Sequence, residues 1–218
     1  MPRFRKPFRL RTLSACLLAA VVSGAGFLAT QSPSARAVAV QQNGVDTFNV
    51  DPVHSTVIFS AMYASVVPFY GQFTEYDGTF AYDGQNPETF KTTFVIPMAS
   101  IDTHNDTRDG HLKSPDWFNA REYPEVTFAS TGLTADGDGT YTLTGDLTLH
   151  GVTRPVSVDV SRLTTRQTPR GFRIGLAGTF SINRSDFGVT AMLDEDGIGD
   201  EVTLQLGVQG VRVESSRE

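Results

Sequence analysis

The sequence predicts an all-β protein, an eight-stranded antiparallel barrel with a short helical insertion. After the N-terminal residues, about eight segments alternate apolar and polar side chains with a period of two, which is typical of strands with one buried face. Turn sequences rich in Gly, Asp and Pro separate most of these segments. Such strands form a sandwich or an up-and-down barrel. The long meander of hairpins favours the barrel, because closure removes the edge strands.

Residues 1–37 are predicted to be a signal peptide rather than part of the fold. Five basic residues precede an apolar run at 13–29, and a small-x-small cleavage site follows at 35–37. The run is slightly shorter than the about 20 apolar residues of a membrane span, so an uncleaved anchor is the less favoured alternative. We therefore expect a periplasmic or secreted protein with one domain at 38–218, and not an integral membrane protein after cleavage.

Charge and cysteine content exclude several classes of function. Residues 1–37 hold 6 of the 18 basic residues and none of the 24 acidic ones, which leaves the exported chain with a net charge of −12. Such a surface repels phosphate backbones, so we expect no nucleic-acid partner. The single cysteine, Cys16, lies in the signal peptide. After cleavage the chain therefore has no disulfide, thiolate metal site or cysteine nucleophile.

The strands follow in order along the chain, each with one apolar and one polar face. In the last one, for example, Val202 and Leu204 share the apolar face. Turn sequences at 83–87, 136–139 and 150–155 separate neighbouring strands. The predicted strands are residues 57–63, 69–82, 94–98, 126–128, 141–149, 156–160, 172–182 and 202–208.

Residues 100–118 break this pattern. The segment is polar, rich in Asp and without a period of two. We interpret it as a loop with a short helix around 107–112 and a second helical turn that begins at Ser114. That turn carries Trp117 and Phe118, large apolar residues that would cap a cavity, anchor the insertion to the barrel, or both. A long ordered insertion of this kind is typical of a lid or of the rim of a barrel.

The inward faces leave open whether the barrel is filled or hollow. An eight-stranded barrel has an interior that side chains can fill or that holds one small ligand. Gly71, Gly145 and Gly178 lie on inward faces, where they either leave room for a ligand or relieve bending of the strands. If a cavity exists, its hydrocarbon walls favour a long lipid tail over a sugar or nucleotide, which needs more polar partners.

Three basic residues are candidate contacts for a polar headgroup. His54 either binds a quinone carbonyl or phosphate at the barrel mouth, or bonds the backbone and fixes the turn, which is the favoured interpretation. Arg108 and Arg184 either meet an anionic headgroup or pair with the nearby Asp109 and Asp186. Pairing is again favoured.

Metal binding and catalysis find little support. His104 and His111 are seven residues apart rather than the three or four that place two ligands on adjacent helical turns, and no third ligand is clearly placed. We instead expect Asp106 to cap the short helix and Asp109 to lie in its first turn. No nucleophile elbow, phosphate loop or zinc-protease motif occurs. The protein is therefore predicted not to be an enzyme and to hold no catalytic cofactor or metal.

A series of short motifs, in order along the exported chain, resembles the YceI-like family of polyisoprenoid-binding proteins. Each match is weak alone, but the ordered set is specific. The resemblance implies an extended lipocalin-like barrel that carries a long isoprenoid, such as a prenylated quinone or polyprenyl lipid, without catalysis or a fixed metal. The motifs are DPVHS at 51–55, YGQF at 70–73, DGTF at 77–80, SIDT at 100–103, RDGHL at 108–112, SPDWF at 114–118, GDLTLHGVTRPV at 145–156, NRSDFG at 183–188 and IGDEV at 198–202.

One departure from the family pattern concerns the polar end of the pocket. Many members carry a His in the second half of the first long strand, where this chain has Tyr63. A phenol keeps a hydrogen-bonding tip but lacks the near-neutral titration of His. The headgroup contact at this position therefore differs from the family pattern.

These observations predict an exported protein whose partner is an isoprenoid lipid or quinone. The oligomeric state is left open, with a homodimer as one alternative. Two alternatives remain: a small-molecule enzyme at the barrel mouth centred on His104 and His111, and a filled barrel that acts as an envelope stress or interaction protein. The predicted ligand-binding residues are His54, Phe59, Tyr63, Phe73, Phe94, Ile96, Arg108, His111, Trp117, Phe118, Phe128, Leu147, Phe180 and Phe187.

Overall fold

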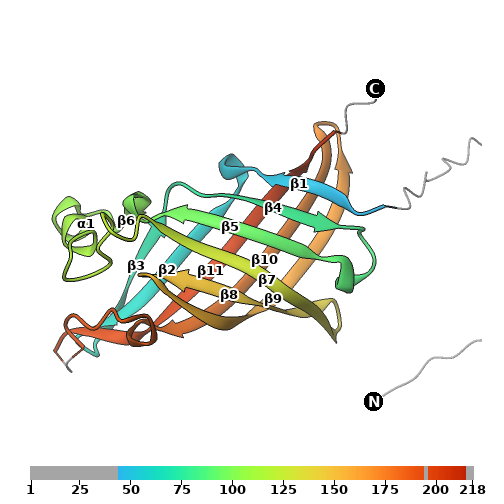
Figure 1. The fold of residues 1–218 in the computed structure, drawn as a ribbon. Coiled ribbons are helices and arrows are strands. Elements are labelled where there is room, and N and C mark those ends of the chain that lie inside the picture. The colour runs from blue at the N-terminus through green and yellow to red at the C-terminus, as the bar shows by residue number, and fades with distance from the viewer. Residues whose placement is uncertain (1–43, 194–195, 215–218) are drawn as a thin grey trace, which may run out of the picture. The chain divides into compact units, whose positions relative to one another are not determined.

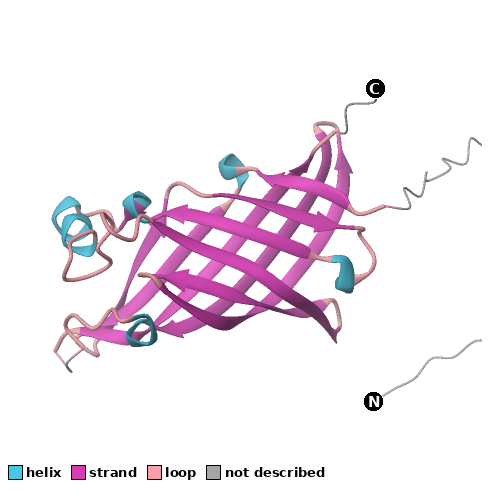
Figure 2. Ribbon diagram, viewed as in Figure 1, coloured by secondary structure: helices cyan, strands magenta, loops and turns pink. Residues whose placement is uncertain are grey.

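The computed structural model describes residues 44–193 and 196–214, and Figure 1 shows the barrel that they form. The predicted signal peptide lies outside these residues. Figure 2 shows that strands dominate the described part of the chain. They are β1 (Asp46–Val50), β2 (Thr56–Tyr63), β3 (Val67–Phe73), β4 (Asp77–Tyr82), β5 (Lys91–Pro97), β6 (Ile101–Asp102), β7 (Glu125–Gly137), β8 (Thr140–Leu149), β9 (Val152–Thr168), β10 (Gly171–Asn183) and β11 (Ile198–Arg212).

Helices are few and short. The α-helix α1 (Asp106–Leu112) is joined by the 3-10 helices η1 (Pro52–His54), η2 (Pro87–Thr89), η3 (Met98–Ser100) and η4 (Arg184–Phe187). Within the described residues no helix has the length and apolar character needed to cross a membrane.

The strands form one antiparallel sheet that closes on itself, because β1 pairs with both β4 and β11. β1 and β2 both pair with β11, while β3 and β4 pair with β2 and β1 in turn. β5 and β6 likewise pair with β4 and β3. Each of these three successive pairs is thus one strand of the barrel with a single interruption. The predicted eight-stranded antiparallel barrel is confirmed.

The prediction missed β1, since it placed no strand before residue 57. The strand has only two inward apolar side chains, Phe48 and Val50, which is too short a pattern to stand out from the polar residues before it. Phe48 is nevertheless completely buried, and it pairs with Phe80 of β4 and Arg212 of β11. β1 therefore closes the barrel.

The insertion after β6 begins with the predicted helix. α1 confirms the helix expected around 107–112, but its N-cap is Asn105, whose side chain accepts a hydrogen bond from the Arg108 amide at 2.9 Å. The expected cap, Asp106, is already the first helical residue. The predicted second helical turn is a set of turns instead, in which the Trp117 amide donates to the Ser114 carbonyl at 3.1 Å.

Inward side chains fill most of the barrel. The main core includes Phe48, Phe80, Phe90 and Ile174, each at most 1% exposed. A second cluster of Phe59, Ile101 and Leu112 lies beneath α1, so the insertion packs over one end of the barrel. We call this the α1 end.

Candidate functional site

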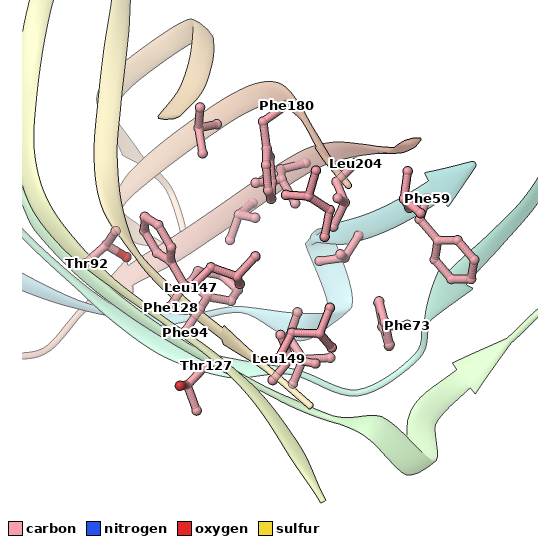
Figure 3. A pocket seen from close by; sticks show the side chains of 18 of the residues that line it. Phe59, Phe73, Thr92, Phe94, Thr127, Phe128, Leu147, Leu149, Phe180 and Leu204 are labelled. Atoms are coloured by element: carbon pink, nitrogen blue, oxygen red, sulfur yellow. The ribbon is translucent and has the colours of Figure 1, made fainter. Parts of the chain in front are cut away.

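A cavity of about 130 Å³ lies inside the barrel and is walled by hydrocarbon. Most of its lining side chains are Phe, Leu, Ile and Val. In Figure 3, Phe59 and Phe73 lie at one end of the cavity and Thr92 lies toward the other. Only three lining residues, Thr92, Thr127 and Arg184, carry a polar side chain. The wall therefore offers extensive apolar contact and few hydrogen bonds.

Eight of the predicted ligand-binding residues line this cavity. All but one lie on strands, where a period of two fixes the inward face. The exception is Phe118, which the insertion places over the α1 end. The eight are Phe59, Phe73, Phe94, Ile96, Phe118, Phe128, Leu147 and Phe180.

Two glycines make room for phenylalanine rings of the wall. Gly71 is paired with Phe59 across β2 and β3, and a Cβ at Gly71 would lie 2.3 Å from the Phe59 ring. A Cβ at Gly145 of β8 would lie 2.3 Å from the Phe128 ring. The space that these glycines leave on the inward face is therefore occupied by aromatic side chains, which in turn line the cavity.

Arg184 is the one charged residue among the lining residues, and it is 2% exposed. It begins η4 directly after β10. Its guanidinium donates to the carbonyls of Gly199 (3.0 Å), Val189 (3.0 Å), Met192 (3.3 Å) and Ile198 (2.7 Å). A guanidinium carries five N–H donors, so one donor on Nη1 makes no hydrogen bond within the described residues.

The charge of Arg184 is desolvated and has no ion-pair partner in the described residues. Burial lowers the pKa of its guanidinium, and the nearby Asp200 carboxylate opposes this effect. The guanidinium carbon lies 5.3 Å from the centre of the Trp117 ring, a cation–π geometry that joins the β10–β11 connection to the insertion. The expected pair with Asp186 is wrong, because the side chain turns inward to backbone carbonyls instead.

Arg108 also forms contacts other than those predicted. Its guanidinium donates to Thr103 through Nε to the hydroxyl (2.7 Å) and through Nη2 to the carbonyl (2.6 Å), and it lies over the Phe69 ring. Asp109, its expected partner, is buried and accepts from the Thr103 amide at 2.9 Å. The pair is therefore wrong, and Arg108 fixes the start of the insertion.

The remaining predicted site residues lie outside the cavity lining. His54 is exposed in η1, and its Nδ1 hydrogen-bonds to the Asp51 carboxylate at 2.9 Å rather than to the backbone. Tyr63 is 49% exposed at the end of β2, and His111 is exposed on α1. Trp117 stacks on Arg184, and Phe187 is buried in the main core. Their contact with a ligand stays a prediction.

The residues around His104 do not converge. His104 Nδ1 lies 3.7 Å from Asp102 Oδ1, whereas Asp109 faces inward to Thr103. Among the described residues, no group of three or more His, Cys, Asp or Glu side chains is placed to hold a metal ion.

Sequence reasoning raised Arg184 as a candidate headgroup contact, but it favoured a pair with Asp186 and left Arg184 out of the predicted ligand-binding residues. The NRSDFG motif marks the position as distinctive, but a basic residue in an acidic chain is expected to be exposed or paired with a carboxylate. The Arg184 side chain points inward because its guanidinium donates to four carbonyls, two in the segment after η4 and two at the start of β11.

Fold and site together define a class of protein, a closed eight-stranded β-barrel with an apolar cavity and one buried cation at its α1 end. The chain belongs to the YceI-like family, whose domain model matches residues 48–210. A UPF0312 protein of Ectopseudomonas mendocina (strain ymp) is 34% identical over 196 residues, covering 89% of this chain and 97% of that protein. A UPF0312 protein of Pectobacterium atrosepticum is 36% identical over 166 residues, covering 76% and 85%.

Solved structures share the fold. The crystal structure of BcnA from Burkholderia cenocepacia matches with a TM-score of 0.66 and 27% identity, over 73% of this chain and 98% of that one. A polyisoprenoid binding domain from Saccharophagus degradans, implicated in plant cell wall breakdown, matches with a TM-score of 0.60, over 76% and 98%. Its identity to this chain is 19%, so this likeness concerns the fold alone.

Proposed function

We propose that this protein binds a long isoprenoid lipid, such as a prenylated quinone or polyprenyl lipid, inside its barrel, for carriage, storage or sequestration outside the cytoplasm. The observation that carries the proposal is the cavity wall, in which hydrocarbon surrounds a space with only three polar side chains. Each Å² of lipid tail that leaves water for such a wall contributes about 25 cal/mol. A sugar or nucleotide would lose its hydrogen bonds there without replacement.

Membership of the YceI-like family supports the same ligand class. The Saccharophagus degradans domain with this fold is described as polyisoprenoid binding. The N-terminal sequence supports export, because residues 1–37 have the order of a signal peptide. The homodimer and the absence of catalysis stay predictions of the same proposal.

Arg184 orients the ligand in this proposal. Its unused N–H and desolvated charge favour a carbonyl or anionic oxygen, so the polar head lies at the α1 end and the tail extends toward Thr92. A cavity of about 130 Å³ is close in size to the roughly 150 Å³ apolar cavity that binds benzene in an engineered protein. A long tail therefore requires the phenylalanine rings of the wall to change rotamer.

The experiment uses protein purified after export of the full chain. Organic extraction followed by mass spectrometry is expected to release an isoprenoid lipid. Added ubiquinone is expected to quench the fluorescence of Trp117, the only tryptophan in the sequence, which lies on Arg184. Absence of any isoprenoid, together with no quenching by ubiquinone, would refute the proposal and favour the filled barrel.

Two variants on one strand supply the control. Leu204 lines the cavity, whereas its neighbour Thr203 faces the other side of β11. Leu204→Lys is expected to abolish ubiquinone binding, and Thr203→Lys to leave it unchanged. Circular dichroism and thermal unfolding check that both variants fold. Equal binding by both would show that the ligand does not enter the cavity.

A further inference from the structure

Exposed apolar side chains gather at the α1 end of the barrel. Val66 is 81% exposed, Tyr70 60% and Met192 53%. Of the ten large apolar residues exposed in the described chain, seven belong to the β2–β3 hairpin or to the segment between η4 and β11. We call these seven the apolar patch: Met62, Tyr63, Val66, Val67, Tyr70, Met192 and Leu193.

The two parts of the apolar patch lie side by side. The Ala64 amide donates to the Gly197 carbonyl at 2.7 Å, and Tyr63 pairs with Ile198. The Ile198 amide in turn donates to the Met192 carbonyl at 2.8 Å. Figure 1 shows the tip of β2–β3 and the connection into β11 together at one end of the barrel. The two parts of the patch are therefore neighbours at one tip of the barrel, and Met62 and Tyr63, adjacent on β2, expose the two faces of that tip.

The hairpin of the patch is uncharged and tightly turned. From Thr56 to Thr74 the sequence contains no charged residue, although the exported chain carries a net charge of −12. Ala64 and Ser65 have positive φ angles of 47° and 54°, in a turn closed by a hydrogen bond from the Val66 amide to the Tyr63 carbonyl. Such turns usually carry Asn and Gly. Here a strained backbone presents Val66 to solvent instead.

The patch is continuous with the end of the cavity that carries the buried cation. Arg184 lines the cavity and donates to the carbonyls of Met192 and Ile198 in the same segment that exposes Met192 and Leu193. Tyr63 and Tyr70 add aromatic side chains with a polar tip, which are enriched where a membrane meets water. A hydrocarbon-walled cavity and an apolar patch built on an uncharged hairpin thus meet at one end of the barrel.

We propose that the apolar patch docks on the surface of a lipid bilayer and sets the α1 end of the cavity against the membrane, so that a lipid passes between the two. This inference rests on the proposed function. Residues 38–218 carry a net charge of −12, so a bilayer of zwitterionic lipid is favoured over an anionic one.

The test measures co-sedimentation of the purified protein with phosphatidylcholine vesicles. Val66→Asp removes one apolar contact and adds a charge, and is expected to lower vesicle binding about tenfold or more. Val53→Asp is the matched control, because Val53 is equally exposed at 83% but lies in η1, outside the patch. It is expected to bind like the unmodified protein. Vesicles that contain phosphatidylglycerol are expected to bind less.

Ligand binding in solution separates this inference from the proposed function. Quenching of Trp117 by a water-soluble short-chain ubiquinone is expected to be equal in Val66→Asp and the unmodified protein, while transfer from vesicles falls in the variant. No vesicle binding by the unmodified protein, or equal binding by both variants, overturns the docking proposal even if ubiquinone binds. A dimer in sedimentation equilibrium that Val66→Asp dissociates, without vesicle binding, overturns it in favour of a protein interface.

Discussion

Two glycine–phenylalanine contacts set the width of the cavity at the scale of single residues. Phe128 lies over Gly145, and Phe59 lies over Gly71, so neither glycine can gain a Cβ unless an aromatic ring moves. The same rings line the cavity. Glycine on an inward face therefore does not by itself indicate space for a ligand.

Gly145→Ala is expected to destabilise the barrel by about 1–3 kcal/mol, since the added Cβ would overlap both the Phe128 ring and the Ala129 carbonyl oxygen, 2.6 Å away. Gly207→Ala on β11 is the control, because a Cβ there has open space. It is expected to be neutral or slightly stabilising. Urea unfolding measures both, and equal free energies of unfolding would show that the ring moves without cost.

Asp51 joins η1 to two distant strands. Its carboxylate hydrogen-bonds His54 (2.9 Å), Gln209 (3.2 Å) and the Val53 amide (3.2 Å), and it lies 3.4 Å from Arg173. Burial acts to raise the pKa of Asp51, but these hydrogen bonds and the charge of His54 outweigh it and lower the pKa below its usual value. The carboxylate form is therefore the one that the fold stabilises.

The stability that Asp51 contributes is present above its unfolded pKa, about 3.9, and is lost as the pH falls through the lower folded pKa. Asp51→Asn is expected to cost about 1–3 kcal/mol at pH 7, the range for hydrogen bonds to a charged group. The difference between the two proteins should shrink at pH 3. Urea unfolding at both pH values tests this, and a difference that stays constant contradicts it.

Among the secondary-structure elements, three neighbouring barrel strands each have one interruption. η1 separates β1 from β2, residues 74–76 separate β3 from β4, and η3 separates β5 from β6. At these interruptions, side-chain hydroxyls donate hydrogen bonds to backbone carbonyls. The Ser100 hydroxyl donates to the Pro97 carbonyl at 2.8 Å, and the Tyr76 hydroxyl donates its one proton to the Ser55 carbonyl, with the Pro52 carbonyl 3.3 Å away.

Tyr76→Phe is expected to lower the free energy of unfolding by about 1 kcal/mol, because it removes the hydroxyl that donates to the Ser55 carbonyl. Tyr76 is 9% exposed, so water replaces the hydroxyl poorly. Tyr70→Phe is the control, since Tyr70 is 60% exposed and its hydroxyl makes no hydrogen bond within the described residues. Chemical unfolding compares the two, and a cost as large for Tyr70→Phe would contradict the role of Tyr76.

Closure of the barrel depends on β1 at the scale of the whole molecule. β1 is five residues long and pairs with strands from both sides of the seam. Phe48 is its fully buried side chain, and its ring lies 5.8 Å from that of Phe172 on β10. A short part of the first barrel strand therefore links the second barrel strand, through β4, to the last one, β11.

Phe48→Ala is expected to cost about 3–5 kcal/mol, the usual range for a buried phenylalanine. Val45→Ala is the control directly before β1, where Val45 is 52% exposed, and is expected to change stability by less than about 0.5 kcal/mol. Thermal and urea unfolding measure both. A cost for Phe48→Ala below about 1 kcal/mol would show that closure does not depend on this side chain.

The sequence predicted the strands and the helix well because these signals are local. Phe94, Phe128 and Leu204 lie in segments whose alternation fixes which face is buried, and all three line the cavity. β1 escaped prediction because Phe48 and Val50 alone do not make a pattern. The interruptions of the barrel strands also escaped prediction. They are recognised only from the strand pairing, for example because β1 and β2 both pair with β11.

The contacts of the polar residues were predicted less well, because no local alternation of side chains indicates them. His54 and Arg184 lie in the 3-10 helices η1 and η4, and Arg108 lies in the short helix α1, so no strand alternation fixes the direction of these side chains. Their partners are Asp51, Thr103 and, for Arg184, carbonyls of the β10–β11 connection and of the start of β11. Which of the three enters the cavity follows from how those loops fold over the α1 end.

The sequence by itself determined an antiparallel barrel with an apolar interior, because the alternation of side chains along each strand is written into consecutive residues. Only the tertiary structure decided where Arg184 lies, how phenylalanine rings use the space beside glycine, and that the segment of Met192 lies beside the β2–β3 hairpin at one tip of the barrel. Those features depend on contacts between residues far apart in the chain, and the closed sheet brings them together.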